Sequence, residues 1–332
     1  MLSLQERAWE TLRAKLERLP HALLLHGPRG VGKRVLAEQF ARLALCERQS
    51  GPPGRLPCGN CESCRWTEAG THPDLRFVEP ESIGRHSGRD AGEVLSADLP
   101  QGQKKPSTEI KIDQVRALQD FVYIGSHRGR RRIVIVHPAE DMNSHAANAM
   151  LKSLEEPPAA ALFLLVSHRP WRLPPTVRSR CVAIAVQVPD SRASIEWLKS
   201  QGVLEPDRWL AYCNGAPELA LQTATGDLGE LIEAQLRLLA QGALVSAAPA
   251  TRKEHLEPLV DLLQKYALDK AFLGFGGQSK YGVARAGVSP EDAQAWLGYA
   301  RDLCRRRLVS RHPLNPGLFA AELVCGLPGT HS

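Results

Sequence analysis

The sequence predicts an α/β domain built on a doubly wound parallel sheet, followed by a helical C-terminal part. Short apolar runs alternate with segments of helical periodicity over residues 1–188, which is the pattern of βαβ units. The first run leads into a glycine-rich loop that opens a helix, as in phosphate-binding proteins. After Pro189 no strong strand pattern follows, so we expect only helices there.

The expected elements of the α/β part follow the apolar pattern along the chain. A stripe of small and aliphatic residues predicts a first helix over about 4–18. Five runs are short and apolar enough to be buried parallel strands: 22–26, 75–79, 132–136, 162–166 and 181–186. Further helices are expected at 33–45, 109–122 and 144–155, the last capped by Asn143 or Ser144 and stopped by Pro157 and Pro158.

Two other stretches complete the expected organisation. Residues 81–108 are polar, rich in Gly, Ser and Lys and without periodicity, which predicts a surface loop. The helical part divides into a small domain at 189–224 and a larger one at 225–332, with joints near 224–229 and 242–250 where Gly and Ala are frequent.

The bulk composition is that of an ordinary globular protein. The chain has 332 residues, enough for two or three domains, of which 43% are hydrophobic and 23% charged. We find no apolar run of about 18 residues and no signal-peptide core, and expect a cytoplasmic protein. The net charge of +6 permits contact with nucleic acid but does not require it.

The glycine-rich loop, residues 27–34, nearly matches the phosphate-binding motif. Gly27, Gly30, Gly32 and Lys33 suit a loop whose N–H groups and lysine hold phosphates. The last position, which should carry the Ser or Thr that binds Mg²⁺, is Arg34. We therefore expect the architecture of the loop without ATP hydrolysis, and leave nucleotide binding open.

The acids that an ATPase of this class carries after the strand at 132–136 are also missing. His137 and Pro138 follow that strand directly. Glu140 and Asp141 come later, and we expect them to be solvated or capping residues rather than catalytic ones.

Four cysteines are grouped, which is typical of a structural zinc site. Cys46, Cys58, Cys61 and Cys64 offer four sulfurs, the ligand set of a closed tetrahedral Zn²⁺ site. An iron–sulfur cluster is the rival, but the spacing that follows Cys64 does not fit a ferredoxin, and unligated thiols are the remaining alternative. The other cysteines are scattered and are expected to fill buried space; they are Cys181, Cys213, Cys304 and Cys325.

Arginines gather in three places. Arg178 and Arg180, just before the last strand, are either solvated loop charges or an arginine finger for a neighbouring γ-phosphate. The clusters at 128–132 and 305–307 are expected to form solvated or acid-pairing surfaces rather than DNA contacts.

Several of these runs together resemble the bacterial clamp-loader subunits of DNA polymerase III. The resemblance is carried by Pro20 to Gly27, the four-cysteine insert, Ala69 to Asp74, Ser144 to Pro158 and Ser179 to Cys181. It is strong over about 1–222 and implies an AAA+ fold: a RecA-like domain at 1–188, a helical lid and a helical collar. It implies that Arg180 acts in trans as an arginine finger.

The resemblance also implies partners. They are gamma/tau motor subunits and a delta subunit, which together with this chain form a hetero-pentameric clamp loader. The clamp loader is part of a DNA-directed DNA polymerase (nucleotidyltransferase) holoenzyme and loads a sliding clamp onto primed DNA during replication. Arg34, His137 and the segment Gly215 to Glu218, which stands where the motor has a sensor arginine, depart from the motor pattern. We therefore expect a non-hydrolysing subunit. The alternatives are an active gamma/tau-type ATPase and a zinc-dependent nucleic-acid-binding module.

Overall fold

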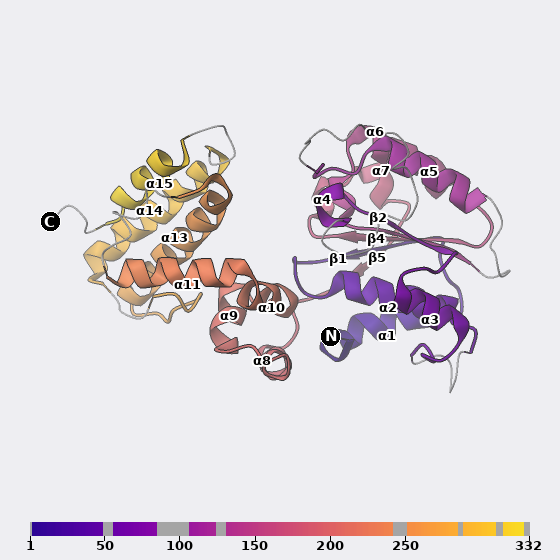
Figure 1. Cartoon of the computed structure of the whole chain (residues 1–332), viewed down its shortest axis with the longest axis horizontal. Helices are drawn as coiled ribbons and strands as arrows, with labels where there is room; N and C mark the ends of the chain where they lie inside the picture. The colour runs from indigo at the N-terminus through magenta and orange to yellow at the C-terminus, as the bar shows by residue number, and fades with distance from the viewer. Residues whose placement is uncertain are drawn as a thin grey trace. The chain divides into compact units, whose positions relative to one another are not determined.

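A computed structural model describes residues 2–48, 56–84, 106–123, 131–241, 251–284, 288–309 and 315–328. The chain divides into two compact units, Met1–Val188 and Pro189–Ser332, which Figure 1 colours from indigo to magenta and from magenta to yellow. Within the described residues, none of the helices is both long and apolar enough to cross a membrane.

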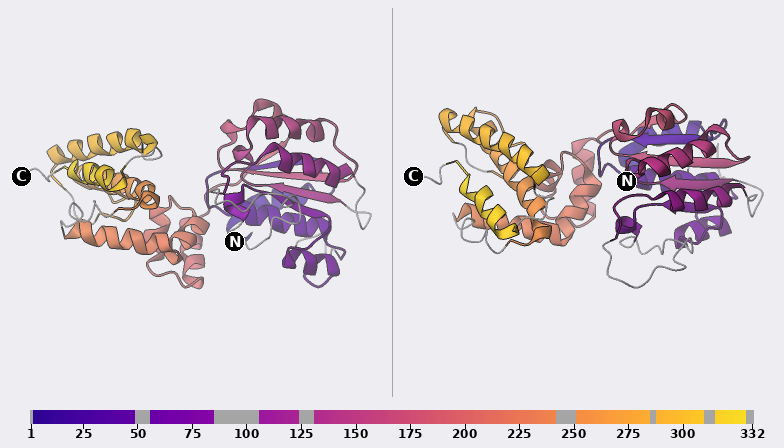
Figure 2. Two further views of the ribbon diagram at one scale, coloured as in Figure 1. Left: turned by 45° about the horizontal axis from the view of Figure 1, so that its top comes forward. Right: turned by 90° about the horizontal axis from the view of Figure 1, so that it is seen from above.

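The first unit is a parallel five-stranded sheet between two layers of helices (Figures 1 and 2). Its strands are β1 Ala22–His26, β2 Leu75–Val78, β3 Arg132–Val136, β4 Ala161–Ser167 and β5 Val182–Ala185, in the order β2-β3-β4-β1-β5. One face is covered by α1 Glu6–Ala14, α2 Lys33–Leu45 and α3 Glu62–Ala69, and the other by α5 Ile112–Tyr123, α6 Ser144–Glu155 and α7 Pro175–Arg178. Shorter elements are η1 Leu2–Gln5, α4 Glu81–Gly84, η4 Ala139–Asp141 and η5 Pro170–Arg172.

The central strands are buried on both faces, as expected when helices cover both sides of a parallel sheet. Leu24, Val134 and Phe163 belong to one apolar cluster with α5, α6 and α7. The alternate residues, such as Leu23 and Ile133, are also fully buried and point to the opposite face. The sheet is therefore a rigid platform, and its loops emerge together at the carboxyl ends of the strands.

The predicted α/β class is confirmed, and the strands lie where their apolar runs predicted them. β1 and β3 match their predicted ranges, β2 differs by one residue at one end, and β4 and β5 differ by one residue at each end. The helices predicted at 33–45 and 144–155 are confirmed as α2 and α6, and Asn143 caps α6 by accepting the N–H of Ala146 at 2.9 Å.

Three predictions about local structure were wrong. The first helix ends at Ala14 rather than 18, and α5 begins at Ile112. Residues 81–84 form a short helix with Glu81 in its first turn, inside a stretch that the absence of periodicity assigned to a loop. The rest of that stretch up to residue 105 lies outside the described residues. Helix α3 was missed because its few apolar residues, one cysteine, one tryptophan and one alanine, form no stripe of helical periodicity.

The described part of the second unit is helical. Its helices are α8 Ser191–Ser200, α9 Pro206–Tyr212, α10 Pro217–Thr225, α11 Asp227–Ala240, α13 Lys253–Gly274, α14 Pro290–Val309 and α15 Pro316–Cys325. Gly226 separates α10 from α11 at one of the expected joints, whereas 242–250 lies outside the described residues. Leu262 of α13 and Ile232 of α11 share an apolar cluster with α8, α9 and α10. The boundary predicted at residue 224 stays a prediction.

A buried carboxylate organises the turn after α13. Asp269 has no exposed surface and accepts the N–H groups of Lys280, Tyr281 and Val283 at 2.7–2.9 Å, together with the hydroxyl of Ser279 at 2.6 Å. These donors balance the cost of burying a charge, so the segment is held to the helix by one side chain.

Candidate functional site

The phosphate loop connects β1 to α2 at the carboxyl edge of the sheet. Gly27 has φ 153°, and a Cβ atom there would lie 2.0 Å from the carbonyl oxygen of Val186, which follows β5. Gly32 has φ 93° and directly precedes the first residue of α2. Only glycine fits such positions, so the backbone keeps the shape that the motif requires even though its last residue differs.

Lys33 is buried within this loop, at 2% exposure. Its ammonium donates to the carbonyl oxygens of Gly27, at 2.8 Å, and of Pro28. The N-terminus of α2 and the lysine thus meet at the loop, which is where a phosphate site of this kind would lie. A phosphate oxygen would have to share or replace the two carbonyl contacts of the lysine.

Arg34 lies in a bridge of charged groups where the motif places a metal ligand. One of its terminal nitrogens is 3.1 Å from Oε1 of Glu79, and its Nε pairs with Glu38 at 3.0 Å. Nδ1 of His137 is 3.5 Å from the same Oε1 atom. Arg34 and His137 stand at the two positions that should supply a hydroxyl and an acid for Mg²⁺, and here both face Glu79.

Glu79 is a residue of this site that the sequence patterns did not single out. It follows β2 directly, and its side chain is 6% exposed. The available signal was an acid at the carboxyl end of a buried strand. The sequence did not show which residue Glu79 would contact. The strand order places β2 beside β3 and thereby brings Glu79 next to His137.

Two histidines lie among cationic groups beside the loop. Burial, followed by the charges of Lys33, His137, Arg29 and Arg169, lowers the pKa of His168 to about 3. Burial and Lys33 also lower the pKa of His26 at the end of β1. Both imidazoles therefore remain neutral near pH 7.

Glu140 is neither solvated nor displaced into a catalytic position. Its side chain is fully buried, and its carboxylate accepts the backbone N–H groups of His168, at 2.9 Å, and Arg169, at 3.1 Å. It therefore joins the end of β3 to the end of β4. The prediction of a capping role is confirmed for Glu140 in this sense, and the prediction of solvation was wrong.

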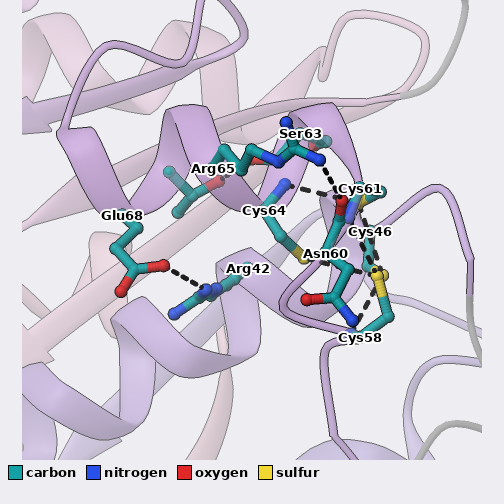
Figure 3. A network of polar contacts seen from close by, with 10 residues as sticks. Arg42, Cys46, Cys58, Asn60, Cys61, Ser63, Cys64, Arg65 and Glu68 are labelled. Carbon is teal, nitrogen blue, oxygen red and sulfur yellow. Dashed lines mark hydrogen bonds and ion pairs between the residues drawn. The ribbon is translucent and has the colours of Figure 1, made fainter.

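The four grouped cysteines converge on one point (Figure 3). Their sulfur atoms all lie within 4.8 Å of one another, with Cys46 and Cys61 at 3.9 Å and Cys58 and Cys64 at 4.0 Å. Tetrahedral zinc with Zn–S bonds of about 2.3 Å places its sulfurs about 3.8 Å apart. The donor set and its spacing could therefore hold a metal ion of this kind.

Backbone N–H groups support these sulfurs. The N–H of Cys58 points to Cys46, that of Cys61 to Cys58, and that of Cys64 to Cys61, each at 3.4 Å. The N–H groups of Asn60 and Cys61 lower the pKa of Cys58 to about 6, whereas burial raises the pKa of Cys64 to about 12. A bound cation would compensate the burial of the Cys64 thiolate.

A chain of hydrogen bonds joins this cysteine cluster to the sheet. Ser63, between two of the cysteines, donates to the carbonyl oxygen of Leu45 and contacts Nε2 of His72 at 2.7 Å. The ring accepts the N–H of Asp74 on its other nitrogen, and the buried Asp74 carboxylate lies 3.6 Å from Arg132 of β3. His72 and Asp74, which belong to the run that carries the family resemblance, thus have a structural role in this chain.

Arg180 follows α7 at the start of the last crossover to β5. Its guanidinium is 2.5 Å from Oε1 of Glu155 and donates to the carbonyl oxygen of Thr176 at 2.9 Å. Arg178 is exposed, two residues earlier.

Of the other two arginine clusters, the one at 305–307 pairs with acids. Arg306 pairs with Asp302 and Glu322, and Arg307 pairs with Asp261, which confirms the acid-pairing interpretation for these two arginines. Residues 128–130 lie outside the described part.

The sheet order, the phosphate loop and the helical second unit are those of the AAA+ class. A family model described as "DNA polymerase III, delta subunit" matches residues 4–190. The DNA polymerase III subunit delta′ of Pseudomonas aeruginosa is 38% identical over 77% of this chain and 71% of its own length. The chain belongs to this delta′ family of DNA polymerase III subunits.

Two further proteins are similar over large parts of the chain. The DNA polymerase III subunit tau of Escherichia coli is 30% identical over 68% of this chain and 30% of its own length. A solved gamma subunit-related protein of Thermotoga maritima covers 96% of this chain and 97% of its own, with 18% identity and a TM-score of 0.49.

Proposed function

We propose that this chain is a non-hydrolysing subunit of the clamp loader. The observation that carries the proposal is the bridge from Arg34 through Glu79 to His137. Mg²⁺ requires oxygen ligands in near-octahedral geometry. At this site a guanidinium and an imidazole stand where a hydroxyl and a carboxylate are needed, and the nearby Glu79 carboxylate already contacts the arginine.

A cation at residue 34 also acts against metal binding by its charge. Two positive charges a few ångströms apart repel, and the repulsion is stronger in a partly buried site than in water. Arg34 therefore neutralises Glu79 in the place of a metal ion. Without bound Mg²⁺ and an acid after β3, the γ-phosphate has neither its counter-ion nor a group to orient an attacking water.

The role that remains is to help build the ring and to act on the nucleotide site of a neighbouring subunit. Similarity to delta′ and tau subunits of DNA polymerase III supports gamma/tau motor subunits and a delta subunit as partners in a hetero-pentamer. In such a ring the chain would present Arg180 to the nucleotide of a neighbouring motor, while the complex loads the sliding clamp onto primed DNA in the cytoplasm. The DNA polymerase activity would belong to the holoenzyme.

The cysteine cluster would hold one structural Zn²⁺. Cys46, Cys58, Cys61 and Cys64 provide all four ligands, which leaves no open position for substrate. The metal would join the end of α2 to the start of α3 and stabilise the hydrogen-bonded path through Ser63 and His72 to the sheet.

The test of the non-hydrolysing role is an ATPase assay on the purified chain. We expect phosphate release with Mg-ATP at the rate of a protein-free blank, because the metal position is taken by Arg34. The Lys33→Ala variant is the control, since any turnover that persists in it comes from a contaminant. Turnover that depends on both Mg²⁺ and Lys33 would identify an active motor-type ATPase instead.

Nucleotide binding is tested separately, with a fluorescent ATP analogue. We propose weak, saturable binding of equal strength with Mg²⁺ and with chelator, because Arg34 rather than a metal would face the phosphates. Lys33→Ala should weaken it about tenfold or more, the usual effect of losing a charged hydrogen bond. Binding that requires Mg²⁺, or no binding at millimolar ligand, would contradict this proposal.

A further inference from the structure

Arg180 is not free at the surface of the first unit. Its side chain is 34% exposed, and one terminal nitrogen lies 2.5 Å from Oε1 of Glu155, whose side chain is 49% exposed. The other terminal nitrogen donates to the carbonyl oxygen of Thr176 at 2.9 Å. The same nitrogen also donates to the hydroxyl of Ser179, at a longer distance of 3.4 Å. Two principal acceptors, one charged and one neutral, thus hold the two terminal nitrogens of the guanidinium.

The acceptors come from different elements. Glu155 is the last residue of α6, and Thr176 lies within the short helix α7, which packs against α6. Val177 of α7 is fully buried in the same apolar cluster as Met150 and Leu154 of α6. Packing therefore fixes the backbone of both acceptors, although the side chain that they hold lies at the surface.

An arginine in this arrangement loses much of its rotamer freedom before any ligand arrives. A long arginine side chain normally gives up considerable conformational entropy when it is ordered. Because the guanidinium is planar and both of its terminal nitrogens are held, the group cannot rotate freely. Its remaining N–H groups therefore point in a fixed direction. Preorganised donors are more effective toward a developing charge than donors that must be oriented during the reaction.

We propose that Glu155 is a positioning residue for Arg180. The inference rests on the proposed function, in which Arg180 faces the γ-phosphate of a neighbouring motor subunit. Glu155 holds the guanidinium in one orientation through its carboxylate, and Thr176 completes the hold through its backbone. Glu155 does not itself touch the nucleotide, so its effect on hydrolysis passes entirely through Arg180.

The test is a double-mutant cycle in the reconstituted complex with motor subunits, delta, clamp and primed DNA. Steady-state ATP hydrolysis gives kcat and KM for Glu155→Ala, Arg180→Ala and the double variant, after assembly is checked by gel filtration. We expect Glu155→Ala to lower kcat about two- to fivefold with an unchanged KM, in line with the contribution of a partly exposed ion pair. Glu155→Gln should lie between, because it keeps a polar oxygen beside the guanidinium but loses the charge of the ion pair.

The decisive expectation is that the effects do not add. With Arg180 already removed, Glu155→Ala should have no further effect, because there is no guanidinium left to hold. A general loss of structure at the end of α6 would instead lower the rate in both backgrounds. Glu156→Ala is the matched control: it removes the same charge one residue away, from an exposed side chain that pairs with none of the described cations.

Three results would overturn the positioning role while leaving the arginine finger intact. They are an unchanged kcat in Glu155→Ala, an increased kcat, which would show that Glu155 restrains Arg180 instead, and a loss that is equal in both backgrounds. An unchanged rate in Arg180→Ala would overturn the arginine-finger part of the proposed function, and this inference with it.

Discussion

Replacing Arg180 with alanine is expected to abolish most ATP hydrolysis at the neighbouring motor site that we propose it faces, while the ring still assembles. A guanidinium beside a transferring γ-phosphate neutralises the charge that develops on it, and such arginines contribute about 10³–10⁵ in rate. Arg180→Lys should recover part of the loss, since lysine keeps the charge but lacks the planar fork. Hydrolysis by the complete complex with clamp and primed DNA is the measurement, with clamp loading as a second readout.

Arg178→Ala is the control for this experiment. Arg178 is exposed on the same short segment, two residues before Arg180. Its replacement by alanine removes the same charge. We expect its complex to hydrolyse ATP at close to the normal rate, since the structure shows no ion pair for it with the described residues. An Arg180→Ala complex that assembles and hydrolyses ATP as fast as the unmodified one would refute the finger assignment.

Replacing Cys61 with serine should release the proposed zinc and loosen the segment around it. Cys61 is the N-cap of α3, and its sulfur accepts the N–H of Cys64. Serine is also a good N-cap, so the substitution keeps this contact and removes chiefly a metal ligand. Structural zinc contributes about 10–16 kcal/mol of binding free energy in small zinc-finger peptides near pH 7.

The measurements are elemental analysis and amide hydrogen exchange, on protein purified without chelators. We expect one Zn²⁺ per unmodified chain and none in Cys61→Ser. The substitution should increase the rate of amide exchange more in α3 than in β3 or β4, because the core around those strands does not depend on the metal. The Cys304→Ser variant should keep the zinc, because Cys304 lies outside the cluster. Cys304 is exposed, as is Cys325, so the expectation that these two cysteines fill buried space was wrong. A zinc-free unmodified chain, or a Cys61→Ser variant that retains the metal, would contradict the zinc proposal.

Local chemistry was sufficient to predict much of this protein. Strands such as Ala22–His26 could be located because they are continuous apolar runs next to glycine and proline, and their burial on both faces needs no knowledge of their neighbours. The phosphate loop and the cysteine cluster depend on short spacings, and their residues lie close together in nearly any fold of the segment. The departures at Arg34 and His137 were equally visible, because a side chain either can or cannot bind a metal ion.

The tertiary structure alone decided how the charged groups pair. Glu79 meets Arg34 and His137 because the sheet order places β2 beside β3, and Glu155 meets Arg180 because α7 packs on α6. Glu140 accepts N–H groups that follow β4, twenty-eight residues further along the chain. An ion pair needs only proximity and opposite charge, and many acids could satisfy each arginine. The packing of elements that are far apart in sequence decides which acid pairs with each arginine. No periodicity or spacing in the sequence could therefore predict these pairs.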